Sequence, residues 1–129
     1  MLGADSRNPY DRRYTVRHQW VTLLPPHRVG ITRFAQEQLG EISYLELPEP
    51  GEHLAADESF GVIESRKAVS DMFMPVAGSV IEVNDDALGD HSLIDLDPYI
   101  AGWLLTIEPD DPADIAHLLD APEYEARTD

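Results

Sequence analysis

The chain has 129 residues, which is the usual size of a single domain that buries one hydrophobic core. It contains 25 acidic residues against 9 lysines and arginines, so its net charge is −16. This charge argues against nucleic acids and anionic membrane surfaces as partners, because both would repel the chain. The chain has no cysteine, which excludes disulfides, thiolate metal ligands and cysteine nucleophiles.

No apolar run in the sequence approaches the roughly 20 residues that span a bilayer. The first residues also lack the apolar core of a secretory signal, so we expect a cytoplasmic protein. Residues 1–12 mix glycine, asparagine, proline and charges without an apolar period, which predicts a flexible N-terminal arm. A single domain is expected over residues 13–129.

Two β-prone segments come first, at residues 18–24 and 27–31, and the two prolines between them predict a hairpin. Thr32 can cap a helix over residues 33–40, which Gly40 ends in a left-handed conformation. Further β-prone segments are bounded by glycine, proline or asparagine, and they cover residues 42–48, 58–64, 69–75, 78–84 and 102–109. The middle of the chain is therefore predicted to form a small sandwich or barrel.

The last predicted element is a helix over residues 110–124. Asp111 can cap this helix, and Pro112 suits its first helical position. Its apolar residues share one face, and they are Ile115, Leu118 and Leu119. We expect this helix to close the domain.

Common catalytic motifs are absent from the sequence, including phosphate-binding glycine loops, His-Glu-x-x-His and Gly-x-Ser-x-Gly. The histidines lack metal-ligand spacing, and we interpret all five as surface or packing residues: His18, His27, His53, His91 and His117. An acidic cluster lacks the ligand spacing of a calcium loop and is interpreted as a solvated face; it comprises Asp85, Asp86, Asp90, Asp95 and Asp97. The sequence thus predicts neither a catalytic residue nor a metal site.

One lysine occupies an unusual place between two β-prone runs. The runs flank Ser65, Arg66, Lys67 and Ala68, where a tight hairpin turn normally uses glycine, asparagine or aspartate. On spacing alone, the simpler interpretation of Lys67 is a solvated turn residue. The residues around Lys67 favour a different interpretation of this lysine.

The stretch GVIESRKAVSD at residues 61–71 resembles the lipoyl attachment hairpin of the glycine cleavage system H proteins. The resemblance runs from about Tyr14 to Tyr124 and includes VGITRFAQEQLGEISYLELPEPG, DPY, GWLL and LLDAPEYE. It implies a mainly β, lipoyl-domain-like flattened barrel or sandwich (a barrel-sandwich hybrid) with a short internal helix and C-terminal helices. It also implies a non-catalytic carrier whose lipoic acid is joined as an amide to Lys67.

The resemblance further implies how the lysine is modified. Glu64, Gly51 and Gly78 stand at the family's spacing from Lys67, which implies recognition by a lipoyl ligase or lipoyl transferase. Biotinyl domains share the hairpin, but they resemble Ala-Met-Lys-Met at the tip, which this chain lacks. A lysine stem plus an acyl chain makes a long tether, which raises the effective concentration of its reactive end near a partner's active site.

Four residues depart from the family's usual pattern, in or near motifs that the resemblance places around the arm. Gln19 stands where the family usually has glutamate, and Arg66 where it usually has valine or threonine. Asp95 stands where asparagine is usual, and Ile100 where glycine is usual. With Ser65 and Ala68 beside the lysine, these residues are expected to flank the arm or to select partners.

Two pathways fit such a carrier. Arg66 favours a paralogue that carries sulfur intermediates or electrons for a heterodisulfide-reductase-like sulfur-oxidation complex, because a guanidinium pairs with an anionic sulfur adduct. The alternative is a glycine cleavage carrier, whose partners are glycine decarboxylase, aminomethyltransferase and dihydrolipoamide dehydrogenase. A third hypothesis is an unlipoylated acidic domain that acts in assembly or regulation.

Overall fold

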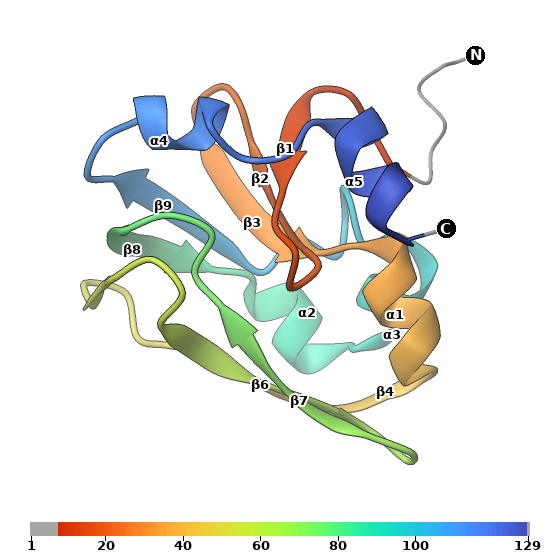
Figure 1. Ribbon diagram of the computed structural model, residues 1–129. Coiled ribbons are helices and arrows are strands. Elements are labelled where there is room, and N and C mark those ends of the chain that lie inside the picture. Colours follow the sequence, from red (N-terminus) through yellow and green to blue (C-terminus); the bar gives the residue numbers. More distant parts are fainter. Residues whose placement is uncertain (1–7, 129) are drawn as a thin grey trace.

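Two antiparallel β-sheets form the body of the molecule in this computed structural model, which describes residues 8–128 (Figure 1). Six strands form one sheet in the order β1-β2-β3-β9-β8-β5, and three form the other in the order β4-β6-β7. The strands are β1 (Arg12–Tyr14), β2 (Gln19–Thr22), β3 (His27–Ile31), β4 (Ile42–Glu46), β5 (His53–Leu54), β6 (Ser59–Ser65), β7 (Val69–Phe73), β8 (Gly78–Val83) and β9 (Leu105–Pro109).

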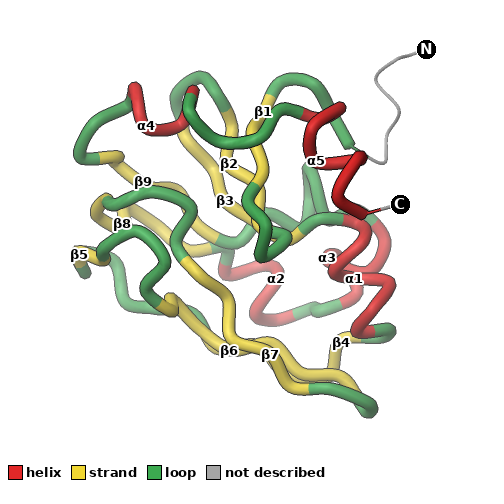
Figure 2. The backbone as a smooth tube through the Cα atoms, in the orientation of Figure 1, coloured by secondary structure: helices red, strands yellow, loops and turns green. Residues whose placement is uncertain are grey.

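Short helices lie around the sheets. They are α1 (Arg33–Leu39), α2 (Asp85–Gly89), α3 (Ser92–Leu96), α4 (Ala113–Ala116) and α5 (Ala121–Thr128). In Figure 2, α1, α2 and α3 gather at one end of the sheets, and α5 lies beside β1. Within residues 8–128, no helix has the length and apolar character needed to cross a membrane.

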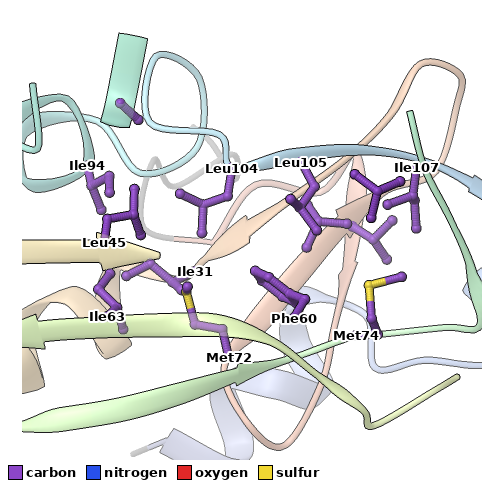
Figure 3. Packing of buried hydrophobic residues seen from close by; sticks show 14 of the residues in the cluster. Ile31, Leu45, Phe60, Ile63, Met72, Met74, Ile94, Leu104, Leu105 and Ile107 are labelled. Carbon is purple, nitrogen blue, oxygen red and sulfur yellow. The ribbon is translucent and has the colours of Figure 1, made fainter. Parts of the chain in front are cut away.

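The main hydrophobic core lies between the two sheets. Ile31 and Leu105 enter it from the larger sheet, and Leu45, Ile63 and Met72 enter it from the smaller one (Figure 3). Each of these side chains is no more than 6% exposed, so the facing surfaces of the sheets are almost fully removed from water. The predicted mainly β class is confirmed, and the sheets form a sandwich because they do not close into a barrel.

A second, aromatic cluster covers part of the outer face of the larger sheet. Tyr14 and Tyr124 stack with ring centroids 4.9 Å apart, and this contact fixes α5 against β1. Trp20 is fully buried beside Tyr99, and its indole Nε1 donates to the carbonyl of Ile31 at 2.8 Å. The part of the outer face over β1 and β2 is therefore packed rather than open to water.

Helix α1 forms as its capping residues predict. Thr32 has extended backbone angles, and its hydroxyl oxygen accepts a hydrogen bond from the backbone N–H of Ala35 at 3.2 Å. Gly40 ends the helix with a φ of 81°, a left-handed value that glycine adopts without steric cost. The predicted hairpin at residues 18–24 and 27–31 is also present, as β2 and β3.

The acidic segment at residues 85–97 is solvated as predicted at Asp85, Asp86 and Asp90, which are exposed, while Asp95 and Asp97 are half-buried. It folds into α2 and α3, and the side chain of Asn84 accepts hydrogen bonds from the backbone N–H groups of Asp86 and Ala87. Ala87 and Ile94 are fully buried. The acidic side chains therefore sit on helices whose few apolar residues join the core.

The predicted C-terminal helix is divided in the structure. The segment between α4 and α5 leaves the helical path because Leu119 and Tyr14 exchange two backbone hydrogen bonds, at 2.8 and 3.0 Å. This bridge continues the edge of the larger sheet, and a continuous helix would not offer β1 the same backbone groups. The side chain of Asp111 accepts from the N–H of Ala113 at 3.0 Å, which matches its predicted capping role.

The N-terminal segment packs onto the domain earlier than the sequence predicts. Asn8 is 3% exposed, and its amide Nδ2 donates to the carboxylate of Glu125 at 3.1 Å. The hydroxyl of Tyr14 donates to the carbonyl of Pro9 at 2.6 Å. Residues 8–12 thus differ from the predicted arm, because long-range partners hold them; residues 1–7 of that arm, and Asp129, lie outside the described residues.

We predict that Gly30→Ala lowers the free energy of unfolding by about 1–3 kcal/mol, because it overpacks the aromatic cluster. A Cβ at Gly30 would lie 2.5 Å from Cζ2 of Trp20, a ring that is fully buried. Urea unfolding measures the change, and Gly89→Ala is the control, because a Cβ there meets nothing within 4 Å. Equal stability of the two variants would contradict the close packing of Trp20 on β3.

Candidate functional site

The β6–β7 hairpin presents Lys67 at its tip. Glu64 and Val69 are the last paired residues, and the backbone N–H of Ser65 donates to the carbonyl of Ala68 at 2.9 Å. The side-chain oxygen of Ser65 also accepts from the N–H of Lys67 at 3.3 Å. None of the tip residues has a positive φ, so this turn has no need for the glycine or asparagine of a tight hairpin.

Lys67 is exposed and is the only lysine in the sequence, a count that could have strengthened the sequence prediction. Its Cε lies 3.5 Å from the position that a Cβ would take at Gly40, at the end of α1. The structure describes no ion pair or side-chain hydrogen bond for its amine among residues 8–128. The amine is therefore accessible for acylation, and the fit of this lysine to an amide-linked cofactor is good.

A groove begins beside the hairpin tip and runs between β7 and α1. It has a volume of about 430 Å³, which lies in the range of small-molecule sites. Ala68 lies at the hairpin side, and the side chains of Phe34, Leu39, Ile63 and Met72 make the walls apolar. An acyl chain attached at Lys67 would find an apolar surface directly next to its attachment point.

The polar side chains at the groove include both donors and acceptors, among them Arg17, Gln19 and Asp71. Gln19 is 3% exposed, and its Nε2 donates to the carbonyl of Arg17 at 2.9 Å. Its Oε1 is buried without a hydrogen-bond partner among the described residues. Arg17 also lines the groove, and its guanidinium stacks over Phe73 at 4.1 Å. The carboxylate of Asp71 accepts a hydrogen bond from the hydroxyl of Ser59 at 3.3 Å. The unpaired Oε1 of Gln19 gives the groove one acceptor that a hydrogen-bond-donating group could satisfy.

His18 lines the same groove and is held from behind by a buried hydroxyl pair. Its Nδ1 lies 2.7 Å from the hydroxyl of Tyr124, which is itself 2.8 Å from the hydroxyl of Thr32. The imidazole packs on Phe34 with ring centroids 4.7 Å apart. Burial of the ring lowers the pKa of His18 below its ordinary value.

The residues predicted around the arm take different places. Glu64 is at the base of the hairpin tip, Arg66 is exposed beside Lys67, and Gln19 lines the groove. Asp95 accepts hydrogen bonds from Gln36 Nε2 and from the N–H of Ile42, both at 3.2 Å, so it fixes the start of β4.

Ile100 differs from the expectation that it faces the arm. It lines a separate pocket with Leu24 and Pro25, at the turn between β2 and β3. This turn and the β6–β7 tip lie at opposite ends of the molecule in Figure 1. Sequence spacing placed Ile100 near a motif, but only the packing of the segment after α3 decides which pocket it lines.

Gly51 and Gly78 have backbone reasons to be glycine. Gly51 has a φ of 97°, and its N–H donates to the carbonyl of Val80 at 2.8 Å. A Cβ at Gly78 would lie 2.6 Å from the carbonyl oxygen of Glu108 on β9. These contacts account for both glycines within the fold, and their predicted part in recognition by a lipoylating enzyme stays a prediction.

A single lysine on a hairpin that projects from a two-sheet sandwich, with an apolar groove at its side, defines a lipoyl-domain-like carrier. The family model described as glycine cleavage H-protein matches residues 12–129. The chain belongs to the glycine cleavage H-protein family. Members of this family are non-catalytic carriers with lipoate attached covalently to a lysine, so this protein is a lipoyl carrier and not an enzyme.

Individual relatives are similar over almost the whole chain. A glycine cleavage system H protein of Anaeromyxobacter sp. (strain K) is 50% identical over 119 residues, which cover 92% of this chain and 93% of that one. One from Bacillus subtilis (strain 168) is 42% identical over 121 residues, covering 93% and 95%. The crystal structure of one from Mycobacterium marinum is similar with a TM-score of 0.85 at 42% identity, covering 92% of this chain and 97% of that one.

We predict that His18 makes part of the stability sensitive to acid. The unfolded chain, with a histidine pKa of about 6.5, binds a proton more readily than the folded chain, in which the pKa of His18 is lowered. The stability that neutral His18 contributes is therefore present above about pH 6.5 and is lost as the pH falls below it. Urea unfolding near pH 7.5 and pH 5.5 measures this loss.

The variant His18→Asn should lose less stability over that pH range than the wild type, because asparagine does not titrate. Asparagine also tolerates the positive φ of 73° at this position. His117→Gln is the comparison, since it removes an imidazole from the end of α4. If His18→Asn and the wild type lose stability equally, His18 is not a source of the acid sensitivity.

Proposed function

We propose that Lys67 bears the lipoyl group and that the chain serves glycine cleavage as the carrier of aminomethyl groups. The observation that carries this proposal is the place of the only lysine, at a hairpin tip beside a groove that holds one unpaired acceptor, Oε1 of Gln19. The partners would be glycine decarboxylase, aminomethyltransferase and dihydrolipoamide dehydrogenase. A lipoyl ligase or transferase would attach the lipoate.

The groove favours an amine over an anionic sulfur adduct. An aminomethyl group is protonated near neutral pH, and the unpaired Oε1 of Gln19 offers it an acceptor that would otherwise stay unsatisfied. Gln19 is thus suited to the same cargo as the glutamate usual in the family, with a hydrogen bond in place of a full charge.

The sulfur-oxidation hypothesis, which the sequence favoured because of Arg66, finds no support in the comparisons. The relatives described above are named for glycine cleavage, and the alternative hypothesis fits them better. Arg66 is exposed at the tip and is not among the residues that line the groove. Its guanidinium is therefore in water, where screening weakens its effect on a charged arm.

The residues of the chain have three tasks in this function. Lys67 supplies the tether, and the exposed tip lets the tether reach a partner's active site. The walls around Leu39 and Met72 would bury the acyl chain between transfers and limit access of water to it. The lipoyl group, held by Lys67, would supply the dithiolane that accepts the aminomethyl group, and this chain's residues would position and shelter it.

We predict that Lys67→Arg abolishes lipoylation while changing the free energy of unfolding by less than about 0.5 kcal/mol, because the side chain is exposed. Intact mass and peptide mapping after co-expression with a lipoyl ligase measure the modification. The matched control is the double variant Arg66→Lys/Lys67→Arg, which moves the lysine by one position. It keeps the charge of the tip and still has a lysine there. Lipoylation of the exchanged variant would show that the position of the lysine is not recognised.

We also predict that the lipoylated protein supports the exchange of the glycine carboxyl group with bicarbonate in the presence of glycine decarboxylase. Gln19→Met keeps the length of the side chain and removes the acceptor, and it should lower the exchange rate by about fivefold to tenfold, as expected for one lost hydrogen bond. Gln19→Glu should keep or raise the rate. Thermal unfolding of each variant separates this effect from misfolding.

Failure of the lipoylated wild type in this exchange would overturn the glycine cleavage proposal. If Gln19→Met exchanges at the wild-type rate, the glycine cleavage proposal stands, but the proposed role of the unpaired Gln19 oxygen is wrong.

A further inference from the structure

A second pocket lies on the outer face of the larger sheet, away from the lipoyl hairpin. It forms where the β2–β3 turn meets the segment after α3, and its volume is about 290 Å³. Two aliphatic side chains at this pocket are unusually open to solvent, since Leu24 is 76% and Ile100 is 66% exposed. None of its lining residues belongs to the groove beside Lys67.

Strand register places two arginines side by side in this pocket. Thr22 on β2 pairs with Arg12 on β1, and its hydroxyl oxygen accepts from the backbone N–H of Arg28 on β3 at 2.9 Å. Paired residues of neighbouring strands point to the same face, and strands lie about 4.8 Å apart, so the two arginine Cα atoms are separated by about 10 Å. The pocket lining thus holds two arginines and one carboxylate, that of Asp11, which leaves it with an excess positive charge in a chain of net charge −16.

Arg12 is held by the protein itself. It is 3% exposed, and its guanidinium lies over Trp20 at 4.5 Å. Its Nη1 donates to the carbonyl of Tyr99 at 2.9 Å, and its Nε donates to the carboxylate of Asp11 at 2.8 Å. This arginine is a fixed part of the pocket with its main donors already used.

Arg28 has no such partner. Its guanidinium lies 4.2 Å from the ring centroid of Trp103, and its Nε is buried without a hydrogen-bond partner among residues 8–128. The structure describes no ion pair for it, although the chain has 25 acidic residues. The buried Nε is closed to a partner, but a planar guanidinium without an ion pair can still bind a carboxylate through its other two nitrogens.

We propose that this pocket is a second docking surface, through which a partner enzyme of the carrier is held by a carboxylate next to an aliphatic side chain. The carboxylate would pair with Arg28, and the aliphatic group would cover Leu24 and Ile100. This inference rests on the proposed carrier function, because a carrier must be bound by several enzymes in turn. A docking surface far from Lys67 leaves the arm free to move while the enzyme is bound.

The exposed aliphatic side chains favour a protein as the occupant over a small carboxylate. A small anion on Arg28 would leave Leu24 and Ile100 in water, whereas a protein surface would bury them. A second copy of the chain is disfavoured, because two copies of net charge −16 repel each other. The observations therefore favour a different protein with an acidic and aliphatic patch.

The test measures the dissociation constant of the lipoylated full-length chain for each of three probes by isothermal titration calorimetry. The probes are glycine decarboxylase, aminomethyltransferase and dihydrolipoamide dehydrogenase. For at least one enzyme, Arg28→Gln and the double variant Leu24→Ser/Ile100→Ser should each weaken binding by about tenfold, the size expected for a central contact. Arg28→Gln should also reduce the salt dependence of binding.

Ile81→Ser is the matched control, because Ile81 is a 53% exposed isoleucine on β8 that lies outside the pocket. It should bind within about twofold of the wild type, as expected for a change outside a contact. Mass spectrometry confirms that each variant is lipoylated, and thermal unfolding confirms that it is folded. If Arg28→Gln does not fold, the double variant of exposed residues still decides the result.

The inference is overturned if all three enzymes bind the pocket variants as tightly as the wild type, if Ile81→Ser weakens binding equally, or if no enzyme binds the wild type. The bicarbonate exchange assay separates this result from a failure of the proposed function. If the wild type supports exchange and the pocket variants bind the enzymes as tightly as the wild type, the docking inference fails and the glycine cleavage proposal stands.

Discussion

The apolar contact between the two sheets is the constraint on which the other features depend. Phe60, Ile63 and Met72 fix β6 and β7 on the core by one face, and the two strands continue past the core to the tip (Figures 2 and 3). Burial ends before the tip, so Lys67 is exposed on a base that is rigid. The sandwich thus separates a stable anchor from a free amine, as a tethered carrier requires.

The same packing creates the groove. Helix α1 ends at Gly40 beside the hairpin tip, and its Leu39 faces Met72 across the groove near the core. Side chains from several elements meet there, and one of them, Gln19, keeps an acceptor without a partner. A groove with apolar walls and an unsatisfied oxygen combines shelter for an acyl chain with a preference for an amine, which links the fold to the proposed cargo.

The two ends of the larger sheet serve different purposes. One end meets the hairpin and α1, where the arm is attached, and the β2–β3 turn at the other carries exposed aliphatic side chains and an unpaired guanidinium. The net charge of −16 makes a pocket with two arginines more selective, because the chain as a whole repels acidic partners. An enzyme held at the turn would have to extend along the domain to bring its active site to the tip.

Local patterns in the sequence determined the mainly β class, the β2–β3 hairpin, the capped helix α1 and the lysine at the hairpin tip, because turn, cap and alternation signals act over a few residues. The tertiary structure decided the rest. It determined that residues 8–12 pack onto the domain and that the C-terminal helix is divided into α4 and α5. It also determined that His18 contacts Tyr124 and which pocket Ile100 lines. His18 and Tyr124 are separated by 106 positions, and Leu119 pairs with Tyr14 across a similar distance in the chain. Such contacts depend on how the sheets pack, and no local pattern encodes them.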